Sequence, residues 1–204
     1  MSTIPGTQSS PYVARNRAPI LAVLRRVLPE RGTVLEIASG TGEHASYFAA
    51  EMPHLTWQPT ERDAAALRSI KAHGAAAGLP NLMPPLALDV TSKTWPLGSA
   101  DAVMAINMIH IAPWTAAEGL MAGAERLLQP GGILYLYGPF KENGIHTAPS
   151  NEAFDASLRA HNKDWGVRDA GDVGKLAVRH RFDLAERVAM PANNLSLIFR
   201  RAVA

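Results

Sequence analysis

Two glycines stand in the segment Glu36-Ile37-Ala38-Ser39-Gly40-Thr41-Gly42, which joins an apolar run to an amphipathic one. Between a strand and a helix, a G-x-G turn lets the backbone approach a ligand, and the helix presents unpaired N–H groups to it. A dinucleotide fingerprint carries a third glycine where this chain has Ala45. Glu36 indicates the ligand type, because a carboxylate repels a pyrophosphate and attracts an α-ammonium group. The loop therefore favours a nucleoside bearing an amino acid; a tight turn without a ligand is the alternative.

Carboxylates also follow the next two apolar runs. Glu61 stands about 20 residues beyond the glycines, where a carboxylate can accept hydrogen bonds from both hydroxyls of a ribose. Asp89 and Val90 close the run LALDV, where the acid can meet the amino group of an adenine. A single acid of this kind is more often a solvated helix cap. Three acids at the carboxyl ends of strands in one sheet indicate a shared ligand site.

The elements that must position these residues alternate along the chain. The predicted strands are 33–38, 55–60, 82–88, 101–107 and 133–137, and the predicted helices are 15–29, 42–52, 63–73 and 115–128. Such alternation is typical of βαβ units, which build a parallel sheet with helices on both faces. Pro84 and Pro85 favour an edge position for the third strand. Thr115 and Glu118 form a capping box that opens the last helix.

The C-terminal runs 182–190 and 195–200 differ, because only four residues separate them. A connection that short cannot cross the sheet, so these two strands must pair antiparallel. The sequence predicts an α/β, Rossmann-like, doubly wound and mostly parallel sheet with a C-terminal hairpin. Residues 1–14 are predicted as a flexible leader, and residues 15–204 as a single domain that includes a substrate-side insertion at 138–170.

The composition excludes several kinds of chemistry. The 204 residues contain no cysteine, which excludes disulfides, thiolate nucleophiles and cysteine-ligated clusters. None of the seven histidines lies close to another in the sequence, so no metal site is expected. A net charge of +2 without a basic run argues against nucleic acid, and no apolar run has the length of a membrane span. The N-terminus lacks the features of a secretory signal, so a cytoplasmic protein is expected.

The ordered set E-x-A-S-G-T-G, Glu61, Asp89 and LLQPGGILYLYGP resembles a class I S-adenosylmethionine-dependent methyltransferase over residues 30–201. The resemblance implies a seven-stranded sheet, with the cofactor's methionine at the glycine loop, its ribose on Glu61 and its adenine against Asp89 and Val90. The cofactor-binding residues that it implies are Glu36, Ala38, Gly40, Gly42, Glu61, Asp89, Val90 and Asn107. Ser39 departs from the usual pattern by replacing a frequent glycine, whereas Glu61 replaces a frequent aspartate and keeps its charge.

A narrower resemblance covers almost the whole chain. The segments RNRAPI, LEIASGTGEHASYFA, WQPTERD, INMIHIAPW, SNEAFDASLR, WGVRD and MPANNLSLIFRR are similar to the methyltransferase-like protein 26 family, a domain of unknown function. This resemblance implies the same fold and cofactor and gives no substrate.

The acceptor of the methyl group should lie beyond the fourth strand, at Asn107-Met108-Ile109-His110. His110 is the candidate base, because its ordinary pKa lies near neutrality; the alternative is that it orients a loop. His44 is a second candidate, and it can equally face solvent. The Asn or Asp followed by two prolines and an aromatic, which enzymes of this fold use to methylate amino nitrogens, is absent.

Polar and aromatic residues outside the sheet are the candidates for a substrate pocket, because loops above strand ends usually build one. They are Tyr12, Arg15, Asn16, Tyr137, Asn143, Asn151, Trp165 and Arg168. Arginine suits a carboxylate through paired hydrogen bonds. The segment 8–20 is therefore expected to be a lid over the cofactor cleft.

These observations predict methyl transfer from S-adenosylmethionine to a small molecule, at an oxygen, nitrogen or sulfur that the sequence leaves open. The lack of a separate recognition domain argues against a polymer substrate. The alternatives are an RNA or protein methyltransferase, a non-catalytic S-adenosylmethionine-binding protein and, third, an NAD-dependent oxidoreductase. The sequence gives no oligomeric state.

Overall fold

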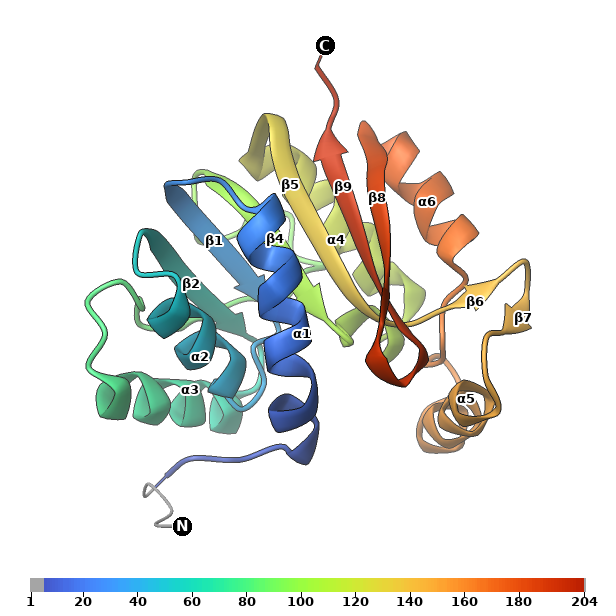
Figure 1. Cartoon of the computed structure of the whole chain (residues 1–204), viewed down its shortest axis with the longest axis horizontal. Helices are drawn as coiled ribbons and strands as arrows, with labels where there is room; N and C mark the ends of the chain where they lie inside the picture. The colour runs from blue at the N-terminus through green and yellow to red at the C-terminus, as the bar shows by residue number, and fades with distance from the viewer. Residues whose placement is uncertain (1–5, 204) are drawn as a thin grey trace.

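The computed structural model describes residues 6–203, which form one seven-stranded sheet with helices on both faces (Figure 1). The strands of the sheet are β1 Gly32–Ile37, β2 Leu55–Glu61, β3 Leu86–Ala87, β4 Ala100–Ile106, β5 Leu128–Pro139, β8 Phe182–Met190 and β9 Asn194–Arg201. The helices are α1 Pro11–Val27, α2 Glu43–Glu51, α3 Ala64–Ala77, α4 Trp114–Leu127, α5 Pro149–His161 and α6 Ala170–Arg179, with short 3-10 turns η1 Met108–His110 and η2 Pro191–Asn193. A separate pair, β6 Lys141–Glu142 and β7 Ile145–His146, lies beside α5 and α6.

The strand order in the sheet is β3-β2-β1-β4-β5-β9-β8. The first five strands run parallel, and β9 is antiparallel to both β5 and β8. This arrangement confirms the predicted α/β, mostly parallel, seven-stranded sheet with its C-terminal hairpin. The direction of strand addition reverses between β1 and β4, and at such a point the connections leave a crevice outside the carboxyl ends of the strands.

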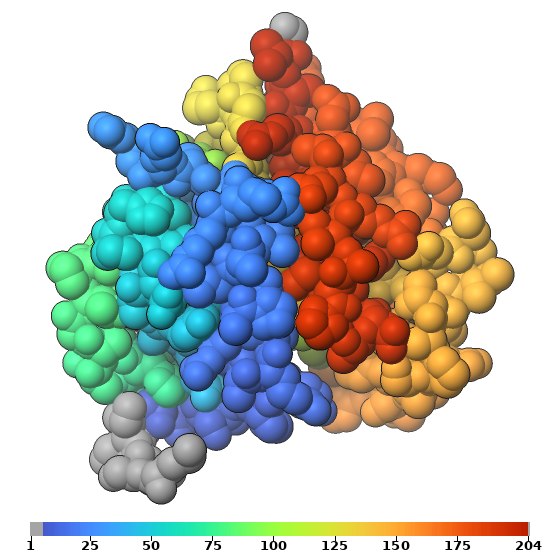
Figure 2. All heavy atoms as spheres, in the orientation of Figure 1, coloured from blue at the N-terminus to red at the C-terminus, as the bar shows by residue number. Residues whose placement is uncertain are grey.

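Two apolar clusters lie on the two faces of the sheet. Alternate residues of β1 enter opposite clusters, Val34 with α1 and α2, and Leu35 with α4 and α6. Helix α1 also lies beside the C-terminal strands, as Figure 2 shows for the blue and red segments of the front face. Arg26 of α1 pairs there with Glu186 of β8 at 2.5 Å. None of the helices within residues 6–203 has the length and hydropathy that crossing a bilayer requires.

Helix α1 begins at Pro11 rather than at residue 15, because a proline at the first helical position already has a helical φ. Part of the predicted leader, residues 1–5, lies outside the described residues. The rest is held against the domain: the Gln8 N–H donates to Ser69 Oγ, and the Ser10 N–H donates to Glu43 Oε2, both at 2.7 Å. The structure therefore moves the start of the helix to Pro11, and the flexibility of the leader stays a prediction.

Two further local predictions need correction. The strand predicted over 82–88 is reduced to Leu86–Ala87 and an isolated bridge at Leu82, because Pro84 and Pro85 have no N–H to donate to the sheet. The predicted capping box at Thr115 is wrong, since α4 begins one residue earlier with Pro113 as its N-cap and without a side-chain cap.

Gly42 has a packing role that a substitution can test. It adopts a φ of +90°, and a Cβ there would stand 2.7 Å from the Cα of Ile70 in α3, whereas Gly78 at φ +61° has open space. We expect Gly42→Ala to lower the free energy of unfolding by roughly 2–4 kcal/mol, and Gly78→Ala by only about 1 kcal/mol. Urea unfolding of both variants measures the difference. Equal losses would show that α2 and α3 tolerate a methyl group between them.

Candidate functional site

A cavity of about 420 Å³ opens at the carboxyl ends of β1, β2 and β4, where the strand order reverses. Its walls include five of the eight residues predicted to bind a cofactor: Ala38, Gly40, Glu61, Asp89 and Val90. Apolar side chains from the end of β4 and the segment after it, Ile106, Met108 and Ile111, form another part of the wall. We call this space the donor cavity.

The carboxylate of Glu61 is fixed in the wall of the donor cavity. Its Oε2 accepts the N–H of Gly40 at 3.1 Å, and its Oε1 accepts the N–H groups of Arg62 at 2.7 Å and Asp63 at 3.2 Å. Three backbone donors thus hold one negative charge at the end of β2. A fixed carboxylate in this position suits a pair of vicinal hydroxyls.

Asp89 is an ionised and exposed acid at the rim of the same cavity. Its Oδ1 accepts both the hydroxyl of Thr91 at 2.7 Å and the N–H of Thr91 at 2.9 Å. These hydrogen bonds hold the pKa of Asp89 below its ordinary value. The carboxylate is therefore an oriented acceptor at the rim.

The two glycines of the β1–α2 loop have different roles. A Cβ on Gly40 would meet only the carbonyl oxygen of Ala38, at 4.0 Å, so the backbone faces open space there. Gly42 instead packs against Ile70 and does not line the donor cavity. Of the two glycines only Gly40 lines the donor cavity as the structure describes it, and the contact of either with a ligand stays a prediction.

Glu36 lies behind the wall of the donor cavity rather than in it. Its side chain is 2% exposed, and its Oε2 accepts the indole N–H of Trp57 at 2.6 Å. Burial raises the pKa of Glu36 to about 7, although the hydrogen bonds from Trp57 and Ser39 oppose the shift. Glu36 thus anchors β1 to β2 next to the loop, and the structure does not bring it to the cavity surface.

A second cavity, of about 440 Å³, lies between α1, α5, the end of β5 and η2. It brings together five of the eight substrate-pocket candidates: Tyr12, Arg15, Asn16, Tyr137 and Asn151. Phe154 and the turn at 191–194 also contribute to its wall, although neither is among the candidates that the sequence predicts. We call this space the acceptor cavity.

Asn107 lies where the two cavities approach each other. Its side chain lines the acceptor cavity, whereas its neighbours Ile106 and Met108 line the donor cavity. The residue has a φ of +59°, and its N–H donates to the carbonyl of Tyr137 at 2.8 Å. This left-handed turn ends β4 and places the two cavities on either side of one residue.

Asn16 links three elements beside the acceptor cavity. Its Oδ1 accepts from His44 Nε2 at 2.8 Å, and its side chain also hydrogen-bonds the hydroxyl of Tyr137. His44 is buried, stacks on Phe48, and has its pKa lowered to about 4, mainly by burial and further by the charge of Arg17. The sequence offered both His44 and Asn16 as candidates but gave no sign that they touch.

His110, the candidate base, is fully buried and lines neither cavity. Its Nδ1 accepts the N–H of Arg168 at 3.2 Å, and its carbonyl accepts the N–H of Gly166 at 2.9 Å. Burial lowers its pKa to about 3, so the imidazole is neutral with its proton on Nε2, which has no partner in the structure. These contacts match the alternative in which His110 orients a loop. Its action as a base stays a prediction.

Three substrate-pocket candidates lie away from the acceptor cavity. Asn143 forms the left-handed turn between β6 and β7 with a φ of +52°. The ring of Trp165 lies 5.3 Å from that of His161. Arg168 donates from Nε to the carbonyl of Ile109 at 3.0 Å, and it lines a different hollow. No cluster of His, Asp or Glu suited to a metal occurs in the part of the chain that the structure describes.

The buried carboxyl group of Glu36 predicts a pH dependence of stability. Its folded pKa of about 7 lies above the ordinary 4.5, so wild-type protein loses stability as the pH rises between these values. We expect the free energy of unfolding of Glu36→Gln to rise relative to that of wild type as the pH increases from about 5 to about 8. The rise should reach up to about 3 kcal/mol, measured by urea unfolding. The exposed Glu30→Gln controls for the lost charge. A pH-independent difference for Glu36→Gln contradicts the raised pKa.

Known structures resemble most of this chain. An O-methyltransferase family protein from Burkholderia thailandensis matches with a TM-score of 0.80 at 17% identity, over 94% of this chain and 58% of that one. The S-adenosylmethionine-dependent methyltransferase SibL, in its apo form, matches with a TM-score of 0.78 at 21% identity, over 94% of this chain and 56% of that one. CalO1, a methyltransferase in calicheamicin biosynthesis, in its SAH-bound form, matches with a TM-score of 0.74 at 16% identity, over 91% of this chain and 54% of that one. The chain spans little more than half the length of these proteins, and at such identities the likeness shows the fold.

A family model extends the comparison to the sequence itself. The model is described as "Protein of unknown function (DUF938)" and matches residues 7–201, which include the walls of both cavities. The chain therefore belongs to the DUF938 family of proteins of unknown function.

Proposed function

We propose that this protein transfers the methyl group of S-adenosylmethionine to a small-molecule acceptor. The observation that carries the proposal is the pair of cavities that approach each other at Asn107, one of which presents the fixed acids Glu61 and Asp89. The similar structures include proteins named as methyltransferases, one of them as S-adenosylmethionine-dependent. The narrower resemblance to the methyltransferase-like protein 26 family forms part of the same proposal.

The walls of the donor cavity fit most of S-adenosylmethionine. Glu61 would accept from the ribose hydroxyls, Asp89 from the adenine amino group, and the apolar wall around Met108 would contact the base. The open backbone at Gly40 admits the methionine end. Glu36 fits less directly, because Trp57 already occupies its Oε2; it would act on an ammonium group only through the loop that it anchors.

The bound cofactor would supply an electrophilic methyl group, and positioning supplies much of the rate of such a displacement. Asn107 stands between the cavities and would orient the acceptor toward the methyl group. Among residues 6–203, Arg15 is the one formally charged side chain in the wall of the acceptor cavity, so it would bind an anionic group on the acceptor. Asn16 would hold Tyr137 and α1 in place and keep water away from the transfer.

The elements around the acceptor cavity favour a small acceptor over a polymer. The acceptor cavity lies between α1 and α5, and the turn at 191–194 forms a further part of its wall. The uncharged amides in this wall, Asn16, Asn107, Asn151 and Asn194, suit hydrogen bonds to a compact polar molecule. His44 and His110 are buried and neutral, and we assign them the positioning of Asn16 and of the loop at 166–168.

Cofactor binding tests the proposal directly. Calorimetry should show that S-adenosylhomocysteine binds and that NAD does not. We expect Glu61→Gln to weaken the binding of S-adenosylhomocysteine at least tenfold, because a charge-assisted hydrogen bond contributes roughly 1.5–3 kcal/mol. The exposed Glu30→Gln should bind like wild type. A preference for NAD, or no binding of either compound, would overturn the proposal.

Arg15 offers a test of the acceptor cavity. A deletion of the predicted lid would not test the cavity cleanly, because it would also remove the buried Val13 and the bond between Asn16 and His44. We instead expect Arg15→Gln to slow methyl transfer from labelled S-adenosylmethionine to a metabolite extract at least tenfold, about 1.4 kcal/mol, with an unchanged melting temperature. The control is Arg17→Gln on the same helix, since that guanidinium stacks on Tyr47 at 4.6 Å outside the cavity. Equal rates for both variants and wild type would remove Arg15 from the site.

A further inference from the structure

A hollow of about 680 Å³ lies on another side of the domain, between α5, α6, the β6–β7 pair and the start of α4. Five cationic side chains line it: Lys141, Arg159, Arg168, Lys175 and Arg179. The acids in its wall are Asp169 and Asp172. It shares no lining residue with the donor or the acceptor cavity. We call it the basic hollow.

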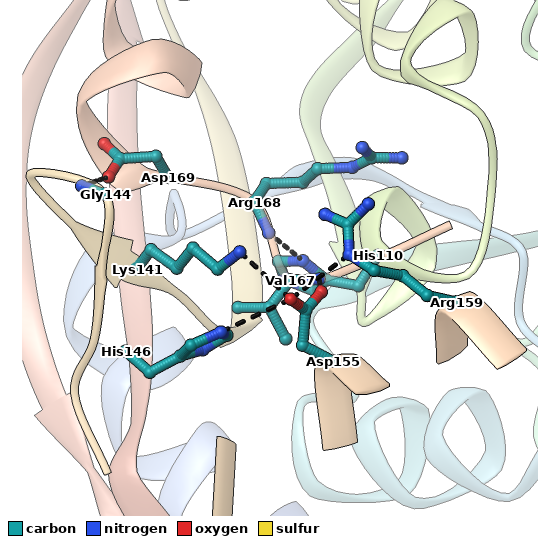
Figure 3. Close-up of polar contacts among 9 residues, drawn as sticks. All are labelled: His110, Lys141, Gly144, His146, Asp155, Arg159, Val167, Arg168 and Asp169. Atoms are coloured by element: carbon teal, nitrogen blue, oxygen red, sulfur yellow. Dashed lines mark hydrogen bonds and ion pairs between the residues drawn. The ribbon is translucent and has the colours of Figure 1, made fainter. Parts of the chain in front are cut away.

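One buried carboxylate serves several of these cations. Asp155 Oδ2 lies 3.0 Å from Lys141 Nζ and 3.3 Å from both Arg159 Nε and His146 Nε2, as Figure 3 shows. Its Oδ1 accepts the N–H of Val167 at 2.7 Å. Asp155 thus holds the cations at the floor of the hollow together but cannot neutralise them all.

Two of the arginines form no ion pair with a carboxylate within residues 6–203, although the charges of Asp155 and Asp164 act on Arg168. The guanidinium of Arg168 donates to the carbonyls of Ile109, Ala112 and Asp164, which carry no net charge. The side chain of Arg179 makes no hydrogen bond or ion pair within residues 6–203 and is exposed on the last turn of α6.

The acids in the wall of the hollow do not supply enough negative charge to balance its cations. Asp169 is engaged by the backbone, since Oδ2 accepts from Gly144 at 2.7 Å and Oδ1 from Gly171 at 2.8 Å. Asp172 pairs with Lys175 at 3.0 Å. With Asp155 and with Asp164, whose charge also acts on Arg168, five cations face four carboxylates, an excess of one positive charge.

We propose that the basic hollow binds a small molecule bearing a phosphate group. A phosphate near neutral pH carries close to two negative charges, so it would be attracted to the excess positive charge in the hollow. Guanidinium groups bind phosphate oxygens in a bidentate manner, and Arg159 and Arg179 offer two of them around one space, whereas Arg168 keeps only Nη1 free of the backbone carbonyls. The half-buried indole of Trp114 in the same wall adds an apolar surface for the rest of such a molecule.

The shape and charge favour a small molecule over a nucleic acid. The cations line one hollow rather than an extended stripe, and the whole chain has a net charge of only +2. A polyanionic strand needs contacts along many phosphates. The described walls of the hollow and of the two cavities have no residue in common, but Arg168 donates to the carbonyl of Ala112, which lines the donor cavity.

The test follows the indole N–H signal of Trp114 by nuclear magnetic resonance, assigned with Trp114→Phe, during titration with pyrophosphate. We expect a saturable shift and, for Arg179→Gln, a dissociation constant raised about fivefold, the size expected for one exposed ionic contact. Arg68→Gln is the matched control, since Arg68 is an exposed helical arginine on α3 without an ion pair in the described chain. It should bind like wild type.

Three outcomes would overturn the proposal: no saturable shift, an equal loss in Arg179→Gln and Arg68→Gln, or displacement of pyrophosphate by a short RNA at far lower concentration. The last result would make the hollow a polymer site. A parallel titration with S-adenosylhomocysteine keeps the two proposals apart. The failure of S-adenosylhomocysteine to bind would count against methyl transfer alone.

Discussion

The reversal of strand order between β1 and β4 is the constraint on which the site depends. Because β1 pairs with β2 on one side and β4 on the other, the connections leaving β1 and β4 pass to opposite faces of the sheet. The space between them cannot be filled by either helix layer. Glu61 lines this crevice as the last residue of β2, Gly40 lines it in the loop after β1, and Asn107 follows β4 beside it.

Backbone strain and buried polar contacts keep the crevice open. Ala38, Gly40 and Asn107 all have positive φ, a conformation that costs a non-glycine residue on the order of 1 kcal/mol. Surrounding hydrogen bonds hold these turns, among them Glu36 with Trp57 and Asn107 with Tyr137. The loops are thus shaped before any ligand arrives, which lowers the entropy that binding must overcome.

The sequence predicted the architecture because apolar periodicity and connection length are local properties. The position of Glu61 at the end of β2 followed from its place in the chain, and the cavity wall contains it. The burial of a side chain is not a local property. The residue types of Glu36 and His110 predict a role at the site, but neighbouring strands and loops bury both side chains. The contact between Asn16 and His44 joins α1 to α2, and neither residue's surroundings in the sequence reveal it.

The placement of α1 beside β9 constrains the order in which this chain can fold. Helix α1 leaves the ribosome before any strand of the sheet, yet Arg26 pairs with β8, and β9 fills the space between β5 and β8. Until β9 emerges, β5 has an unpaired edge whose centre, Leu134 to Tyr137, is buried in the finished protein. Such an edge can pair with other chains. Nascent chains halted before β9 are therefore the species of this protein most prone to aggregate.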